Sequence, residues 1–600
     1  MRREDCCLYY SANEYRQLPA SCIGPPGALN MRHRFKIAGL LCICMAASAS
    51  GQAPPTKSLT QVRTADPFKI ESGSLFSASA SPQQSSNGAG FAAAGMSRAA
   101  ADFEEALELI RSNHVDARTI ETSELSRSAI VGMLRTLDPH SNYYDAREYH
   151  EMLDEQRSEY SGIGATIANY NRDGQMGTYI LATTPGGPAA RAGLIYGDRI
   201  AAVNGETMDG LTSDVVRDKV RGPGGTAVRL TIAHAAAGST SVIELRRGRL
   251  YQASLPDAYI LGRGVGYVDL TNGFNFTTSD ELDAAIKSLK RQGAASLVID
   301  LRGNPGGVLD QAVKVAEKFL PAGSVVVSQR GRSRIDNRVW RSTNKTPETM
   351  PLVLLVDEYS ASASEVVAGA LQDHDRALIV GERTFGKGLV QTVVDLPSGA
   401  GLTITTARYF TPSGRSIQRD YSSGSIYDYY NHKGGPAPAD LEKVRTTTDS
   451  KRPVFGGDGI APDETKKADR LTPFQTSLID QLFQFSVTAG GSPLALAGRS
   501  KAEAMTFVDA VDTSESRETV ASFVKFVLND PEFAGKTDLL DAEQNFIRTR
   551  LQYNLAMRSG GAAAAARVLI SNDPQVAAAV SFLPRAAQMA RAAVNFRASK

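Results

Sequence analysis

The chain has 600 residues, and its 66 Lys and Arg nearly balance its 64 Asp and Glu, so the formal net charge at pH 7 is +2. This length exceeds what one hydrophobic core organises and predicts several domains. The balanced charge, without a long block of like charge, argues against a nucleic-acid partner. All five cysteines fall within the first 44 residues, which excludes disulfides and thiolate metal sites from the rest of the chain.

The first 50 residues predict an over-extended start followed by an export signal. Met31, the expected true start, opens the basic stretch MRHRFK, and the apolar run IAGLLCICMAA and the small residues SASG follow it. This order is typical of a signal peptide, and the apolar run is too short to span a bilayer. We therefore expect an exported protein, periplasmic or associated with the cell envelope, that is either soluble after cleavage or held by an N-terminal anchor.

Two segments lead into the body of the chain. Residues 51–96 are rich in Ser, Ala, Gly, Gln and Pro without a sustained apolar period, which predicts a disordered linker. The string SASAS occurs in this linker, where neither a helix nor a strand is predicted around it. Residues 97–155 carry apolar side chains at helical spacing, as at Phe103, Leu107 and Ile110, and predict an N-terminal helical region.

The middle and end of the chain change pattern twice. Residues 156–250 alternate β-branched residues with Gly and Asp turns and include a short helical stretch at 212–220, which predicts a β-rich domain. In residues 251–470 strands alternate with helices, which predicts an α/β core with a largely parallel sheet. Strands are expected at 265–270, 296–301, 324–328, 352–357, 377–381 and 402–410, and helices at 279–292, 308–320 and 362–373. The segment 417–450 predicts a surface insertion, and 471–600 predicts a C-terminal helical region.

The motifs give no support to metal, phosphate or Ser/His chemistry. The seven histidines are scattered, H-E-x-x-H is absent, and TFGKGL lacks the rest of a phosphate-binding loop, so we expect no metal and no cofactor. The nucleophile motif G-x-S-x-G is also absent, and His374 follows Ser362 by twelve residues. On a continuous helix that separation is about 18 Å, whereas a base lies within about 3 Å of its nucleophile.

A serine with a lysine base fits the stretch 352–396. An apolar strand leads into a tight loop, and a helix is predicted to begin near Ser362, where free backbone N–H groups and the helix dipole favour negative charge. After the next strand, a Gly-flanked loop presents Lys387. A neutral lysine can take the proton of a serine, and apolar neighbours lower its pKa toward that state. Gln391 is a neutral group that would orient the lysine without stabilising the ammonium.

This stretch resembles the C-terminal processing peptidases, also called tail-specific proteases, which are serine peptidases with a Ser/Lys dyad. Their pattern has the nucleophile as the middle serine of S-A-S-A-S-E, the lysine in F-G-K-G and a glutamine four residues later. The spacing of 25 residues between Ser362 and Lys387 (387 − 362) selects Ser362 over Ser360 and Ser364. Residues 98–465 carry the resemblance, with the supporting segments LDPHSNYYDAREY, YSGIG, VIDLRGNPGGVLDQAVKVAEKFLP, YFTPSGRSIQ and GGDGIAPD.

The resemblance implies an oxyanion hole in the segment LRGNPGG. Either Gly306 or Gly307 would form it together with the backbone amide of Ala363, and the alternative is an ordinary strand-to-helix turn. We assign no catalytic role to two acidic residues of the predicted helix. Glu365 suits the helix dipole in the first turn, and Asp373 near the end of the helix is expected to be structural.

A second resemblance is to PDZ domains. The segment PGGPAARAGLIYGDRIAAVNG is similar to their core signature, which implies that SGIGATI binds a C-terminal carboxylate. The implied peptide-binding residues are Gly162, Ile163, Gly164, Ala165, Thr166 and Ile167. The backbone N–H groups of the first three would hold the carboxylate, and the peptide would add as a strand beside the last three. The alternative is a glycine turn in an ordinary sandwich, and Arg221 is either a sensing contact to the peptidase core or a solvated surface arginine.

Together these features predict an α/β peptidase core, crotonase-like and ClpP-like, with an inserted PDZ domain and helical N- and C-terminal regions. The expected function is an exported serine endopeptidase that grips the free C-terminal tails of protein substrates in its PDZ domain and cleaves through an acyl-enzyme. A homo-oligomer or an adaptor protein is left open as a partner. The alternatives are a non-catalytic PDZ scaffold or ligand carrier on a crotonase-like core, and a crotonase-fold enzyme that binds coenzyme A. The last would lack the inserted PDZ domain and would have no use for the dyad.

Overall fold

The computed structural model describes residues 88–598 apart from 158, 173, 236–237, 423–428, 431–444 and 489–513. The predicted signal peptide and residues 51–87 of the predicted linker lie outside the described residues. The chain divides into two units, residues 26–129 and residues 1–25 with 130–600. Within the described ranges, no helix combines the length and the apolar character needed to cross a membrane.

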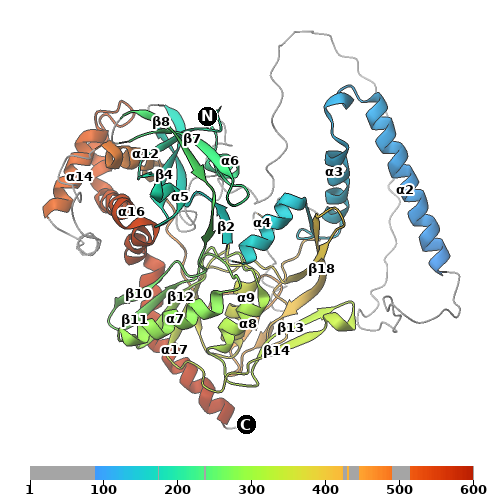
Figure 1. Ribbon diagram of the computed structural model, residues 1–600. Coiled ribbons are helices and arrows are strands. Elements are labelled where there is room, and N and C mark those ends of the chain that lie inside the picture. The colour runs from blue at the N-terminus through green and yellow to red at the C-terminus, as the bar shows by residue number, and fades with distance from the viewer. Residues whose placement is uncertain are drawn as a thin grey trace, which may run out of the picture. The chain divides into compact units, whose positions relative to one another are not determined.

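The unit of residues 26–129 is helical in its described part (Figure 1). It contains α2 (Gly88–Asn113), the 3-10 turn η2 (Ala117–Thr119) and the first part of α3 (Thr122–Arg135). The linker prediction is therefore wrong for residues 88–96, because α2 begins at Gly88. This stretch, GAGFAAAGM, is rich in alanine, which has the highest intrinsic helix propensity and offsets the cost of the neighbouring glycines.

The predicted β-rich domain is an antiparallel sheet with two short helices. Its elements are β2 (Glu159–Gly162), β3 (Ala165–Arg172), β4 (Gln175–Thr183), α5 (Pro188–Arg191), β5 (Arg199–Val203), β6 (Glu206–Thr207), α6 (Ser213–Val220), β7 (Ala227–Ala233), β8 (Thr240–Arg246) and β9 (Gly248–Tyr251). The strand order is β3-β4-β5-β7-β8 with β6 beside β5, and β2 pairs with β9. Val228, Leu230 and Ile232 of β7 are buried on one face, as the alternating sequence predicts. The order leaves β3 at an edge of the sheet.

The main sheet of the α/β core has the order β10-β11-β12-β15-β16-β21. These strands and the helices between them are β10 (Asp257–Gly262), β11 (Val265–Asp269), α7 (Thr278–Arg291), β12 (Ser296–Asp300), α8 (Leu309–Glu317), β15 (Leu352–Val356), α9 (Ala363–Asp373), β16 (Leu378–Gly381) and β21 (Glu464–Thr465). Only β10 runs antiparallel to its neighbour, which confirms the prediction of a largely parallel sheet.

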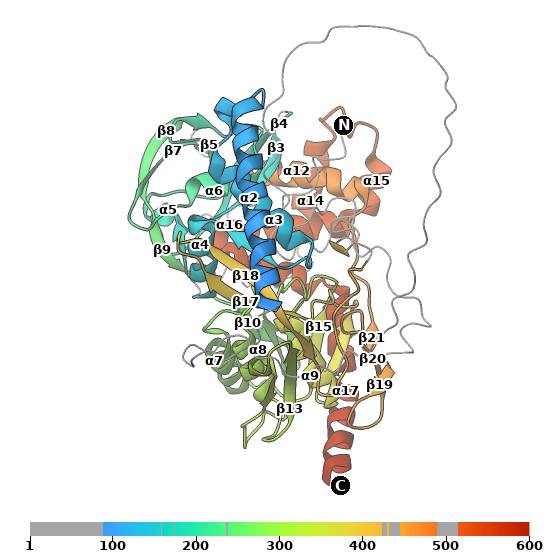
Figure 2. The same ribbon diagram turned by 90° about the vertical axis from the view of Figure 1, so that its right-hand side faces the viewer.

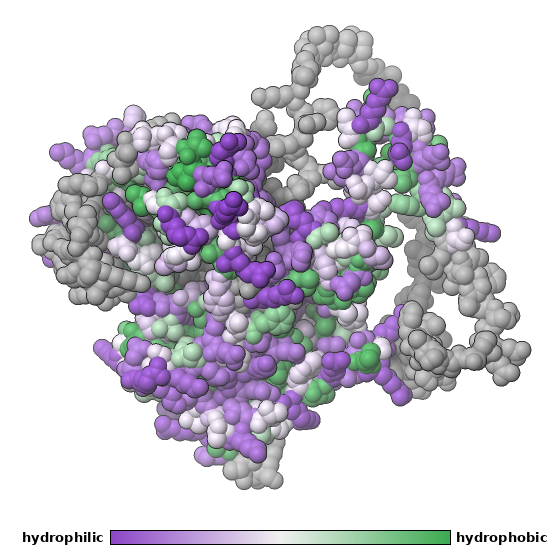
Figure 3. Space-filling model, in the orientation of Figure 1, coloured by the Kyte–Doolittle hydropathy of each residue, from purple (hydrophilic) through white to green (hydrophobic). Residues whose placement is uncertain are grey.

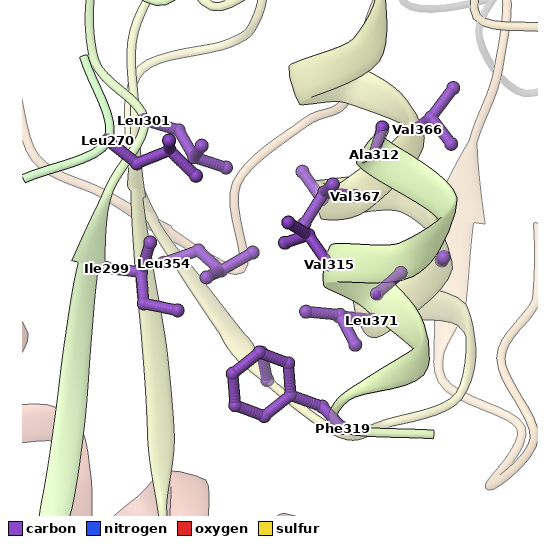
Figure 4. Close-up of a cluster of buried hydrophobic side chains, with 14 of the residues drawn as sticks. Leu270, Ile299, Leu301, Ala312, Val315, Phe319, Leu354, Val366, Val367 and Leu371 are labelled. Atoms are coloured by element: carbon purple, nitrogen blue, oxygen red, sulfur yellow. The ribbon is translucent and has the colours of Figure 1, made fainter. Parts of the chain in front are cut away.

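Helices cover both faces of this sheet. Helices α7, α8 and α9 pack on one face, and α17 (Pro574–Ala598) packs on the other. Figure 4 shows Ile299 and Leu354 of the sheet facing Val315 of α8 and Val367 of α9. Because both faces are covered, β15 is apolar and buried at every position. The visible outer surface over α7 and α8 is mainly hydrophilic (Figure 3), as expected of amphipathic helices.

A second sheet is antiparallel and lies outside the pattern that the sequence predicts. Its order is β1-β18-β13-β14, with β17 beside β18. The strands are β1 (Asn142–Tyr144), β13 (Val325–Gly331), β14 (Arg338–Arg341), β17 (Leu389–Asp395) and β18 (Gly401–Phe410). The predicted strands 324–328 and 402–410 are real, but placing them with the parallel strands is wrong. Short hairpin connections between β13 and β14 and between β17 and β18 require antiparallel pairing.

Three smaller pieces complete these layers. Strand β1 and the following helix α4 (Ala146–Gln156) lie in the region predicted to be helical, so that prediction holds for α4 but not for β1. The turn η3 (Arg334–Asp336) joins β13 to β14. Strands β19 (Arg445–Thr447) and β20 (Pro453–Phe455) pair with each other.

The predicted C-terminal helical region connects the β-rich domain to the α/β core. Besides α17 it contains α12 (Pro473–Thr488), α14 (Ser514–Val527), α15 (Thr537–Ala542) and α16 (Gln544–Ser571). Helices α12 and α16 pack on β3 and β4, while α17 runs along the main sheet (Figure 2). Phe483 of α12 stacks on Tyr170 of β3, with ring centroids 3.8 Å apart and planes inclined by 6°.

Replacing Phe483 by alanine is expected to destabilise this junction. The ring is 1% exposed and also meets Tyr179 at 4.9 Å between centroids, and loss of a buried phenylalanine costs about 3–5 kcal/mol. In thermal unfolding we expect the main transition of Phe483→Ala to move down by about 5 °C or more. Leu539→Ala, at a half-exposed position on α15, is the control, and an equal shift in both variants would contradict the packing role.

Candidate active site

The loop between β15 and α9 presents Ser362 at the N-terminus of α9. Asp357 anchors this loop, because its Oδ1 accepts hydrogen bonds from Gly303 N at 2.8 Å and from Ser360 N at 3.0 Å. Ser362 has φ 55° and ψ −112°, a backbone conformation that residues other than glycine rarely adopt. Such strained backbone persists only where the surrounding structure holds it, and it is common at active sites.

The three serines of SASAS differ in what their hydroxyl groups do. Ser360 Oγ donates to Leu301 O at 2.7 Å, and Ser364 Oγ donates to Asn304 O at 3.0 Å. Both of these serines are fully buried, whereas Ser362 is partly exposed. The two outer serines therefore fasten the loop to the neighbouring strand end, and the middle one is available to a substrate.

Gly306 of LRGNPGG lies directly against Ser362, and the following Gly307 lies against the backbone of Phe274. A Cβ atom on Gly306 would stand 2.7 Å from Ala361 O, 2.8 Å from Ser362 Cβ and 2.9 Å from Ala363 N, so only glycine fits there. Gly306 N donates to Asn304 Oδ1 at 2.9 Å. Among the described residues, Gly307 N and Ala363 N have no hydrogen-bond acceptor outside their own element. The backbone here can thus offer N–H donors beside the serine hydroxyl.

Lys387 is held in a tight loop between β16 and β17. A Cβ atom on Gly386 would stand 2.9 Å from Arg419 Cβ and 3.1 Å from Gly459 N, which requires glycine before the lysine. Burial lowers the pKa of Lys387, while the charges of Glu365 and Asp138 oppose that shift. A lowered pKa favours the neutral amine that a general base needs.

One buried carboxylate ties the serine loop to the lysine loop. Glu365 Oε2 accepts hydrogen bonds from Ser362 N and Lys387 N, both at 2.8 Å. Its Oε1 accepts from Thr384 Oγ1 at 2.6 Å and from Gly386 N at 2.7 Å. Burial raises the pKa of Glu365, and these four hydrogen bonds oppose the rise by stabilising the carboxylate. The sequence pattern assigns Glu365 only to the helix dipole, but the structure makes it the common anchor of both loops.

Gln391 lies on β17, four residues after the lysine. Its Nε2 donates to Thr405 Oγ1 on β18 at 3.2 Å. Within the described ranges no hydrogen bond joins Gln391 to Lys387. The orienting role of Gln391 stays a prediction.

A cavity of about 470 Å³ lies between β3 and α6, and all six predicted peptide-binding residues line it. Arg217, Val220 and Arg221 line the side of α6, and Asn272 of the α/β core lines one end. The guanidinium carbon of Arg221 lies 5.5 Å from the ring centroid of Tyr160. Because β3 is an edge strand, an extended peptide can pair with it. The cavity thus combines a free strand edge, a glycine loop and basic side chains.

Comparison with known proteins agrees with this geometry. The profile of Peptidase family S41 matches residues 264–429, and that of the PDZ domain matches residues 152–233. A carboxy-terminal-processing protease of Bartonella bacilliformis is 38% identical over 323 residues, which cover 53% of this chain and 72% of the relative. The chain belongs to the carboxy-terminal processing protease family. It is a serine peptidase with a PDZ domain that binds peptide substrates.

Two further proteins extend the comparison. A carboxyl-terminal-processing protease of Synechocystis is 34% identical over 316 residues, or 52% of this chain and 72% of the relative. A solved photosystem II D1 C-terminal processing protease is 29% identical, with a TM-score of 0.32, over 61% of this chain and 92% of that one. The β-rich domain is hereafter the PDZ domain, and the α/β core is the peptidase core.

The peptidase places two further residues near Lys387 that the sequence pattern does not single out. Asp138 accepts hydrogen bonds from His140 N and Ser141 N, both at 2.8 Å, and from Ser141 Oγ at 2.6 Å. Burial and the charge of Lys387 lower the pKa of His140 to about 3. These residues precede Ser362 by more than 200 positions. In the sequence they belong to LDPHSNYYDAREY, a segment that supported the family resemblance but to which no function was assigned.

Part of the predicted surface insertion is in fact buried beside the lysine loop. Tyr429 is 3% exposed, and Gln418 and Arg419 are buried as well. Gly388 N donates to Gln418 Oε1 at 2.8 Å, and Gln418 Nε2 donates to Tyr429 Oη at 3.2 Å. The prediction of a surface segment at 417–450 is therefore wrong for these residues, because their side chains complete the surroundings of the site. Residues 423–428 and 431–444 of this segment lie outside the described residues.

The residues excluded from catalysis have structural partners in this peptidase. His374 caps the far end of α9, where its Nδ1 lies 2.9 Å from Asp449 Oδ2 and its Nε2 lies 2.7 Å from Val325 O. Asp373 accepts hydrogen bonds from Arg415 Nη2 at 2.8 Å and Ser413 N at 3.0 Å. Both side chains connect α9 to neighbouring loops at the end opposite Ser362.

Proposed function

We propose that this peptidase captures the C-terminal tails of exported proteins in its PDZ domain and cleaves them through an acyl-enzyme on Ser362. Lys387 is the general base, and the core is of the crotonase-like and ClpP-like type. One observation carries the proposal. The backbone N–H groups of Ser362 and Lys387 share the same buried oxygen of Glu365, which holds the nucleophile and base loops together.

The chemistry follows from the positions of these groups. The neutral amine of Lys387 takes the proton of Ser362 Oγ as the oxygen attacks the peptide carbonyl. The developing oxyanion accepts hydrogen bonds from Gly307 N and Ala363 N, aided by the positive end of the α9 dipole. Gly307 is favoured over Gly306 because Gly306 N already donates to Asn304 Oδ1. Lys387 then protonates the leaving amine and activates the water that hydrolyses the acyl-enzyme.

Tail capture uses the edge of β3. The N–H groups of the loop at residues 162–164 hold the carboxylate, and the tail adds as a strand beside residues 165–167. Arg217 and Arg221 line the same cavity, where Arg217 also pairs with Asp214 and Asp218. Export to the periplasm or cell envelope rests on the sequence of the first 50 residues.

The test compares two unfolded substrates that differ only at the C-terminus, one with a free carboxylate and one amidated. We expect the full chain to cleave both, with KM for the amidated substrate raised about tenfold, the effect of losing roughly 1.4 kcal/mol of carboxylate binding. The value of kcat should change less than KM. Equal KM values would contradict tail capture, and tail binding without cleavage would favour the scaffold instead.

A further inference from the structure

Four aromatic side chains from three distant segments gather beside the lysine loop. They are His140, Phe385, Tyr429 and Tyr430, here called the aromatic cluster. The ring centroids of His140 and Phe385 lie 5.5 Å and 5.7 Å from that of Tyr429, both in edge-to-face geometry. Tyr430 meets His140 at 6.2 Å. Phe385 is two residues before Lys387, and the charge of Lys387 lowers the pKa of His140, so the cluster lies beside the lysine loop.

Hydrogen bonds connect the aromatic cluster to the lysine loop. His140 Nε2 lies 2.8 Å from Tyr429 Oη, which also accepts from Gln418 Nε2. Gln418 Oε1 in turn accepts from Gly388 N, next to the lysine. A neutral imidazole fits this chain, since its Nε2 accepts the hydroxyl proton of Tyr429 while the tyrosine oxygen accepts from the amide. Tyr430 Oη donates to Pro139 O at 2.9 Å, which ties Tyr430 to the segment that carries His140.

The charged groups around Lys387 are already engaged elsewhere. The titratable or charged groups that face this region are Asp138, His140, Glu365, Arg419, Tyr429 and Tyr430. Both carboxylates accept several hydrogen bonds, and among the described residues neither forms an ion pair with the amine of Lys387. Arg419 lies over the ring of Phe385, 5.2 Å from its centroid. Desolvation is therefore the cause that lowers the pKa of Lys387, against the opposing charges of both carboxylates.

We infer that the aromatic cluster excludes water from the amine of Lys387, which makes His140 and Tyr429 positioning residues for the general base. The inference rests on the proposed Ser362/Lys387 mechanism. Tyr429 is too buried, at 3% exposed, to act as a substrate-binding surface. His140 is a poor base itself, because its pKa of about 3 leaves it little affinity for a proton.

The inference is tested by the pH profile of kcat/KM for Tyr429→Ala in the full chain. Opening the cluster to water should raise the pKa of Lys387 toward its ordinary value of about 10.4. The amine is then protonated at neutral pH, so the acid limb of the profile should move to higher pH by about one unit or more. Activity should recover as the pH rises above the new pKa, which a merely unfolded variant would not do. An acid limb that coincides with the wild-type limb would overturn the inference.

Three further variants sharpen the result. Tyr429→Phe keeps the ring and removes the hydroxyl, so its acid limb should move by less than half as much as in Tyr429→Ala. An equal shift in both would assign the effect to the hydrogen bond and overturn the role of water exclusion. Tyr421→Ala removes a ring that meets Tyr429 at 6.3 Å between centroids and, among the described residues, no other ring of the aromatic cluster, so it should leave the limb in place. His140→Ala carries the same expectation as Tyr429→Ala if the latter does not fold.

The proposed function and this inference fail in different ways. A wild-type chain as inactive as Ser362→Ala at every pH would refute the mechanism. An active wild type with an unmoved acid limb in both Tyr429→Ala and His140→Ala would refute the aromatic cluster alone.

Discussion

Ser362→Ala is expected to lower kcat/KM by about 10⁴-fold or more, because removal of a serine nucleophile abolishes the acyl-enzyme route. The variant should fold normally, since Ser362 N donates to Glu365 and Ser362 O accepts from Val366 N, and alanine keeps both backbone groups. Steady-state cleavage of an unfolded protein with an apolar C-terminus measures the loss. Retention of more than a tenth of the wild-type rate would rule out Ser362 as the nucleophile.

Replacement of Lys387 should lower kcat/KM by the same order of magnitude as Ser362→Ala. Lys387→Ala removes the base, and Lys387→Arg should not restore it, because a guanidinium stays protonated and cannot accept the serine proton. The loop backbone is held through Lys387 N to Glu365 in either variant. Because serine and lysine act as one unit, the double variant should be no slower than the slower single variant by more than a few-fold.

Ser364→Ala is the matched control for both changes. This serine donates to Asn304 O and is buried. Its replacement should lower the free energy of unfolding by about 1 kcal/mol and leave the reaction rate nearly unchanged. If Ser364→Ala folds and its kcat/KM stays within tenfold of the wild-type value, the hydroxyl group of Ser364 is not needed for the reaction, unlike that of Ser362. Complete inactivity of the folded control would instead point to Ser364.

Gly306→Ala is expected to reduce kcat/KM by about 10²–10³-fold, the usual cost of disturbing an oxyanion hole. A Cβ atom at this position would stand 2.8 Å from Ser362 Cβ and within 3 Å of two backbone atoms of the serine loop. Backbone at that distance cannot rotate away as a flexible side chain does, so the serine loop must move. We expect KM to change less than kcat, because the tail-binding cavity lies in the PDZ domain.

The control for Gly306→Ala must carry the same backbone cost without the clash. Gly293 has φ 90° and would place its Cβ atom in open space. Gly293→Ala should therefore lose about 1 kcal/mol of stability and keep its activity. If the two variants lost activity equally, the loss would have to come from backbone strain rather than from contact with Ser362.

The sequence alone determined much of the candidate site. The spacing of Ser362 and Lys387, the glycines beside them and the strand that precedes each loop are all formed by residues close together in the chain. Features of this kind can be recognised from the sequence. The parallel sheet was also predictable, because strands buried on both faces must be apolar throughout, as β15 is. Turn residues and alternation predicted the β-rich domain, whereas its peptide-binding glycine loop and strand were implied by the resemblance to the PDZ signature.

Only the tertiary structure decided what surrounds the two reacting side chains. Glu365 became their common anchor because folding brings four donors around one carboxylate, which no spacing rule predicts. His140 and Tyr429 lie beside the lysine loop although they are far from Lys387 in the chain, the latter in a segment that was predicted to be a surface insertion. Desolvation and hydrogen bonding act between groups that are close in space, so the pKa of the lysine is a property of the fold and not of the motif that contains it.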